Sequence, residues 1–67
     1  MYPNFEAERA RADMTLEDLV KEIGGTIGSL SNKLRGVYNL SFDDAVALKR
    51  ALKTEIPLEV LFEKRGS

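Results

Sequence analysis

The sequence has no cysteine, no histidine and no tryptophan among its 67 residues. The chain therefore lacks thiolate nucleophiles, imidazole bases and the ligands of nearly every zinc site, which leaves carboxylates and hydroxyls as its only reactive groups. We expect a protein that is not an enzyme and that uses no metal and no cofactor. No apolar run approaches the ~20 residues that span a bilayer, and no charged segment precedes an apolar stretch as in a signal peptide. We expect a cytoplasmic protein with no membrane contact.

The composition is that of a folded domain. Hydrophobic residues make up 43% of the chain and charged residues 31%, as in soluble globular proteins. A chain of this length has room for one compact core, so we expect residues 1–67 to form a single domain with residues 65–67 frayed. The net charge of −1 argues against a generic nucleic-acid-binding protein, because such proteins usually carry a basic surface.

Five short helices are predicted by capping residues and by apolar spacing. Asn4, Thr15, Thr26 and Ser41 are of the types that cap helix N-termini, and Pro57 suits the first position of a last helix. The double glycine at 24–25 and the single Gly36 mark helix ends. The predicted helices cover residues 5–12, 16–23, 27 to about 35, 42–53 and 58 to about 64. Short helices joined by short connections indicate a small all-α bundle.

The apolar spacing also predicts the core. Residues that recur every three or four positions line the inner side of each helix, and Tyr2 is expected to pack over the helix ends. We expect Ile27 to be buried and Phe42 to lie on the inner face of its helix. The strongest core candidates are Leu16, Leu19, Ile23, Leu30, Leu34, Leu48 and Leu52.

Residues 15–36 have the organisation of a helix-turn-helix motif. A capped helix, a glycine turn and a second capped helix follow one another with very little linker. In such a motif the first helix packs across the second and leaves the outer face of the second free to enter the major groove of DNA. The outward positions of the second helix are Gly28, Ser29, Ser31 and Asn32, with Ile27 as a further candidate and Lys33 and Arg35 at the flanks.

Nearly the whole chain resembles the phage-repressor, or lambda-repressor-like, family of helix-turn-helix domains. MYPNFEAERARADMTLEDLVKEIGG is similar to the first two helices of its short members, LSNKLRG to the end of their recognition helix, and SFDDAVALKRAL with IPLEVLF to helices four and five. The resemblance implies a transcriptional regulator, such as a repressor, in a bacterial or phage-infected cell, bound to double-stranded DNA at the nucleoid. It also implies a homodimer, often formed through the C-terminal helix. We expect apolar contacts from Leu58, Val60, Leu61 and Phe62, some to the core and some to the partner copy.

Five positions depart from the family pattern, two of them, Val20 and Gly25, where the family usually has alanine and an apolar side chain. Leu16 stands where the family commonly has a phosphate-binding glutamine, and Ile27 and Gly28 stand where it often has polar base-reading side chains. Asn32 and the serines therefore remain as the main side chains that could form hydrogen bonds with the edges of DNA bases. An asparagine can bond the N6 and N7 atoms of adenine, and an isoleucine can contact a thymine methyl group.

The charges are unevenly distributed along the chain. Residues 1–22 carry six acidic and three basic side chains, whereas residues 23–42 carry two basic side chains and no acidic one. We expect phosphate contacts from Thr26 with the first amides of its helix, and from Lys33, Arg35, Tyr38 and Asn39. So few cations predict weak binding by one copy and a shallow salt dependence. Dimerisation on two half-sites would raise the affinity.

Two other readings remain open. The same fold can serve as a protein-interaction module that binds a regulatory protein and little DNA. The slightly acidic net charge and the absence of polar side chains at Ile27 and Gly28 are compatible with this alternative. An enzyme that uses Asp43 and Asp44 as paired carboxylates is disfavoured, because adjacent residues on a helix do not point at one site.

Overall fold

In the computed structural model, residues 2–64 are described, and they form five helices and no strand. The helices are α1 (Pro3–Arg11), α2 (Leu16–Ile23), α3 (Ile27–Leu34), α4 (Phe42–Leu52) and α5 (Leu58–Leu61). This confirms the predicted all-α bundle of short helices. The predicted fraying concerns residues 65–67, which lie outside the described residues.

Two helices begin with reciprocal capping boxes. The Thr15 hydroxyl accepts a 3.1 Å bond from the Asp18 amide, and the Asp18 carboxylate accepts a 3.0 Å bond from the Thr15 amide. Ser41 and Asp44 repeat the pattern at the start of α4, at 3.0 and 3.4 Å. Each pair satisfies two amides that have no partner within the helix. The predicted starts of both helices are therefore confirmed.

The predicted start of the first helix is wrong. α1 begins at Pro3, and Asn4 lies inside the helix rather than capping it. A proline at the first helical position costs no hydrogen bond and already has a helical φ. The Asn4 side chain instead donates a 2.8 Å bond to the carbonyl of Val60 and so joins α1 to α5.

The last three helices end earlier than predicted. α3 stops at Leu34, with Arg35 as its C-cap, and α4 stops at Leu52. Lys53 caps α4 with a left-handed φ of 56°, a conformation that ends the helical hydrogen bonding. α5 is a single turn that ends at Leu61, with Pro57 as its N-cap rather than its first residue.

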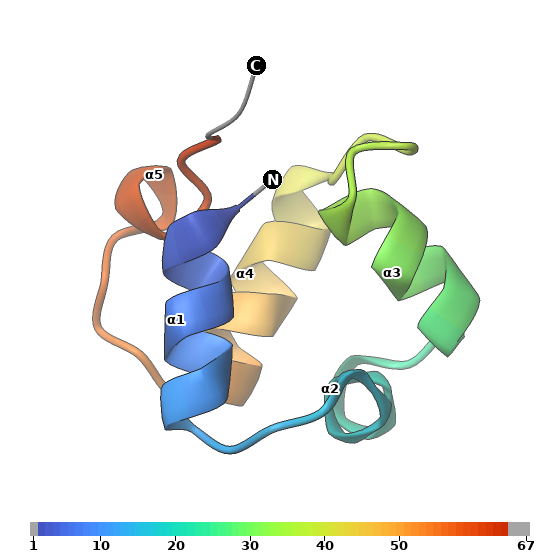
Figure 1. Ribbon diagram of the computed structural model, residues 1–67, viewed down its shortest axis with the longest axis horizontal. Coiled ribbons are helices and arrows are strands. Elements are labelled where there is room, and N and C mark those ends of the chain that lie inside the picture. Colours follow the sequence, from blue (N-terminus) through green and yellow to red (C-terminus); the bar gives the residue numbers. More distant parts are fainter. Residues whose placement is uncertain (1, 65–67) are drawn as a thin grey trace.

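α4 occupies the centre of the bundle, between α1 and α5 on one side and α2 and α3 on the other (Figure 1). Among the core candidates, Leu16 and Ile23 are only half-buried and pack at the edge of the core. The prediction that Tyr2 packs over helix ends is confirmed. The buried side chains are Tyr2, Phe5, Leu19, Leu30, Leu34, Leu48, Leu52 and Leu61.

Two expectations about the core are wrong. Phe42 is 73% exposed and Ile27 is 45% exposed. At about 100° per residue, Phe42 lies about a quarter turn away from the stripe formed by Leu48 and Leu52. Ile27 is the first residue of α3, and two of the three residues in the turn before it are glycines, which have no side chains to cover it.

Within residues 2–64, no helix has both the length and the apolar character needed to cross a membrane.

Candidate nucleic-acid interface

A three-residue turn joins α2 to α3. Gly24 has φ 85° and ψ 175°, a region of backbone conformation that essentially only glycine adopts. Gly25 follows with φ 92°, and Thr26 then caps α3 by accepting a 3.1 Å bond from the Ser29 amide. In Figure 1, α2 is seen end-on while α3 runs across the view. The two axes therefore cross at a steep angle, although so few residues separate them.

The inner side of α3 holds the helix on the bundle. Leu30 and Leu34 are buried in the core. With about 100° between successive residues, the opposite side carries Gly28, Asn32 and Arg35. A Cβ atom placed on Gly28 would meet no atom within 4 Å. Gly28 and Arg35 on this side are exposed, and Asn32 between them is half-buried. α3 lies at the edge of the molecule in Figure 1.

The first turn of α3 offers free backbone donors. Thr26 satisfies the amide of Ser29 and, through its carbonyl, that of Leu30. The amides of Ile27 and Gly28 have no acceptor among residues 2–64. Unpaired amides and the helix dipole make a helix N-terminus favourable for a phosphate group.

The loop after α3 folds back against the end of that helix. The Asn32 carbonyl accepts bonds from the amides of Val37 at 2.9 Å and Tyr38 at 3.4 Å, and Gly36 makes the turn with φ 86°. Tyr38 is 56% exposed and Asn39 is also exposed. Both predicted contacts of this loop therefore lie on the surface that continues from the C-terminus of α3.

One of the two cations of this region is paired. The Lys33 ammonium lies 2.9 Å from the Asp44 carboxylate in the first turn of α4. The Lys33 hydrogen bond is the main reason that the pKa of Asp44 lies below its ordinary value, and the two bonds from Ser41 act in the same direction against partial desolvation. Arg35 is exposed and has no acidic partner among residues 2–64.

The structure brings all ten predicted DNA contacts to one helix and the loop that follows it, and buries none of them. Ser29, Ser31, Asn32 and Lys33 are half-buried and the other six are exposed. We call this set the α3 surface. It consists of Thr26, Ile27, Gly28, Ser29, Ser31, Asn32, Lys33, Arg35, Tyr38 and Asn39.

The four residues expected at a dimer interface have different environments. Leu61 is fully buried in the core of one copy and offers nothing to a partner. Phe62 is half-buried and stacks on Phe5, with ring centroids 5.4 Å apart. Leu58 is half-buried, and Val60 is 46% exposed. Leu61 therefore serves the core, and Val60 is the most exposed of the four. The dimer contact itself stays a prediction.

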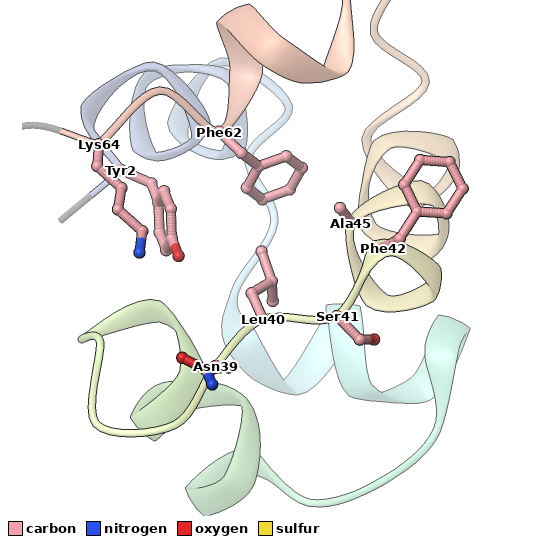
Figure 2. Close-up of a pocket in the computed structure, with 8 residues that line it drawn as sticks. All are labelled: Tyr2, Asn39, Leu40, Ser41, Phe42, Ala45, Phe62 and Lys64. Atoms are coloured by element: carbon pink, nitrogen blue, oxygen red, sulfur yellow. The ribbon is translucent and has the colours of Figure 1, made fainter.

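Sequence reasoning missed an apolar surface beside the α3 surface. Val37, Tyr38 and Phe42 are exposed at the α3–α4 connection. Next to them lies an open hollow of about 320 Å³. Figure 2 shows Phe62 and Leu40 in its middle, with the Phe42 ring turned outward at its rim. The helical position of Phe42 relative to Leu48 is the signal that could have shown its exposure.

Comparison of the chain with protein-family models, with curated proteins and with solved structures gave no match.

Proposed function

We propose that the α2–turn–α3 unit acts as a helix-turn-helix and that α3 binds double-stranded DNA in the major groove, as in a transcriptional regulator of the phage-repressor type. One observation carries the proposal. Leu30 and Leu34 anchor α3 on its inner side, and the opposite side carries the exposed Gly28 and Arg35, the half-buried Asn32 and no acidic residue. A helix held in this way has the shape and the charge that the major groove accepts.

The side chains of the α3 surface suit two kinds of DNA contact. The Asn32 side chain has no hydrogen-bond partner among residues 2–64, and its amide matches the N6 and N7 atoms of adenine. The exposed methyl groups of Ile27 suit a thymine methyl. The free amides of α3 and the side chains of Arg35, Tyr38 and Asn39 suit phosphate groups, which position the protein without reading sequence.

The affinity of one copy should be low. Each Lys or Arg that neutralises a phosphate steepens the fall of log binding constant with log salt concentration by about 0.9. Arg35 is the one cation of the α3 surface without an acidic partner among the described residues. We therefore propose that the chain binds as a homodimer. Two copies of α3 about 34 Å apart would reach successive major grooves.

The test is a titration of a labelled random 30-base-pair duplex pool at low and at moderate salt, followed by selection of bound sequences. Arg35→Ala should weaken binding several-fold and reduce the salt slope. Arg50→Ala is the matched control, because Arg50 is also an exposed arginine near a helix C-terminus but lies on α4. Asn32→Ala should alter the selected sequence at one position. Absent binding at low salt, or equal losses in both arginine variants, would contradict the proposal.

A second candidate is a protein-interaction module, favoured by the exposed apolar side chains of Val37, Tyr38 and Phe42. Contiguous apolar residues on a small domain commonly mark a protein contact. If this is the main function, Phe42→Ser abolishes binding of a protein partner while DNA binding stays unmeasurable. If DNA binding is the main function, Phe42→Ser leaves the affinity of the monomer for DNA unchanged.

A further inference from the structure

The ion pair between Lys33 and Asp44 joins two helices at the edge of the α3 surface. Lys33 lies in the last turn of α3, and Asp44 in the first turn of α4. Their charged atoms are 2.9 Å apart, and the side chains are 29% and 30% exposed. The pair is thus neither a loose surface contact nor a fully buried one.

Asp44 is also part of the N-terminal cap of α4. Its Oδ2 atom accepts the Ser41 amide at 3.4 Å, and the same oxygen accepts the Lys33 ammonium at 2.9 Å. Cap and ion pair both favour the ionised carboxylate. Asp44 therefore presents a negative charge at neutral pH beside a helix that otherwise lies in an acid-free segment.

Lys33 and Asp44 line the same small hollow as the beginning of α3. The hollow has a volume of about 80 Å³, and Thr26 and Ser29 lie on its wall. A phosphate group that approached the first turn of α3 would thus face the Asp44 carboxylate and would find the nearest ammonium already paired. The carboxylate holds the position relative to Lys33 that a phosphate oxygen would take.

Resting on the proposed function, we propose that Asp44 lowers the DNA affinity of this protein by competing with a DNA phosphate for Lys33. The two side chains are about 30% exposed, and a partly exposed ion pair is worth about 1 kcal/mol or less, so phosphate oxygens can replace the carboxylate at that cost. When the pair opens, Lys33 adds a phosphate contact to those of the α3 amides and Arg35. The affinity of the protein for DNA is therefore set partly by a residue outside the recognition helix.

The test replaces the carboxylate while keeping the cap. Asp44→Asn removes the charge, and its amide oxygen can still accept the Ser41 amide. Because a phosphate no longer has to displace the carboxylate from Lys33, the duplex affinity should rise up to about fivefold at about 50 mM salt, the ratio that corresponds to about 1 kcal/mol for a partly exposed ion pair. Asp44→Ser, which also keeps a small acceptor, serves as a second variant if Asp44→Asn does not fold.

Two control variants distinguish the release of Lys33 from a general effect of net charge and from an effect of the helix cap. Asp43→Asn makes the same change in net charge in the same turn of α4, where Asp43 is exposed and has no cationic partner among residues 2–64. Asp18→Asn changes the equivalent member of the α2 capping box, which pairs with no lysine of another helix. Both should change the affinity less than about twofold. In the background of Lys33→Gln, Asp44→Asn should have no larger effect than Asp43→Asn.

The outcomes distinguish the two proposals. If the wild type binds duplex DNA and Asp44→Asn equals Asp43→Asn, the role of Asp44 is overturned and the proposed function stands. A lower affinity of Asp44→Asn also overturns the role, since it would mean that the pair positions α3 for binding. If neither the wild type nor Asp44→Asn binds at low salt, both proposals fall.

Discussion

The ring of Phe62 stacks on that of Phe5, with centroids 5.4 Å apart and an interplanar angle of 24°. Tyr2 also contacts Phe62, in a T-shaped arrangement with ring centroids 5.6 Å apart. Residues from the two ends of the chain thus share one aromatic cluster. Because α5 is only one turn long, it cannot be stable alone, and these contacts hold the C-terminal segment on the bundle.

Phe62→Ala should therefore destabilise the protein. The variant loses both aromatic contacts and part of the apolar burial of a half-buried ring, which we expect to lower the free energy of unfolding by about 2 kcal/mol. Urea denaturation followed by circular dichroism measures the change. Phe42→Ala is the matched control, because that ring is 73% exposed and its loss should cost less than ~0.5 kcal/mol. Equal losses in the two variants would refute the assignment.

The glycine turn between α2 and α3 should tolerate substitution less well than α3 itself. Gly24 has φ 85° and ψ 175°, so Gly24→Ala should lower the free energy of unfolding by about 1–3 kcal/mol from backbone strain alone, since no atom lies within 4 Å of the added Cβ.

Gly28→Ala should have the opposite effect on folding. Gly28 is inside α3, and its added Cβ also meets nothing, so alanine should raise stability by about 0.5–1 kcal/mol. The same methyl group would stand between α3 and bound DNA. We expect a more stable protein with weaker duplex binding. Thermal unfolding and the duplex titration test the two parts separately, and unchanged DNA affinity would mean that this part of α3 does not approach the groove.

Acid should weaken the fold through two capping carboxylates. The pKa of Asp44 lies below its ordinary value of 3.8, chiefly because of the Lys33 hydrogen bond. The pKa of Asp18 lies below the same value because of the bonds from Thr15. A lowered folded-state pKa contributes stability that is fully present above the unfolded value and is lost as the pH falls through the folded one.

The melting temperature should therefore decrease when the pH is lowered below about 4. The double variant Asp18→Asn/Asp44→Asn should begin less stable and lose less on acidification, whereas Asp43→Asn should follow the wild type. A melting curve series from neutral pH to strong acid tests this. Parallel acid losses in the wild type and the double variant would show that other carboxylates dominate.

The proposed homodimer should depend on the exposed side of α5. Val60 is 46% exposed while its neighbour Leu61 is fully buried, so Val60→Asp can disrupt a contact between copies without disturbing the core. Sedimentation should show a dimer for the wild type and a monomer for this variant, with unchanged circular dichroism. Should both sediment as dimers, the copies meet elsewhere, and Phe42→Asp at the apolar rim becomes the informative variant.

The starts of α2, α3 and α4 could be predicted because each depends on a local hydrogen bond. Thr15, Thr26 and Ser41 all cap the helices they were expected to cap, and the donors involved lie within three residues. The first helix was predicted, but it begins at Pro3 rather than at Phe5, because proline suits the first helical position and Asn4 does not act as a cap. The contact that decided the role of Asn4 lies on α5, 56 residues away, where no local pattern indicates it.

The exposure of the site residues was harder to predict. Ile27 keeps the spacing of Leu30 and Leu34, but burial at a helix end depends on what the neighbouring turn carries, and here it carries glycines. The pairing of Lys33 with Asp44 depends on how α3 meets α4, which is a property of the tertiary structure. Whether the α3 surface binds DNA stays a prediction.

The bond between Asn4 and Val60 places the first and last helices side by side. Residues near the two ends could therefore be connected by a brief linker, and the chain could be opened at the exposed Tyr38–Asn39 loop instead. Such a circular permutant would keep every helix while freeing the C-terminus of α3 from its covalent link to α4. Two copies could likewise be joined head to tail on one polypeptide, each half retaining its own fold.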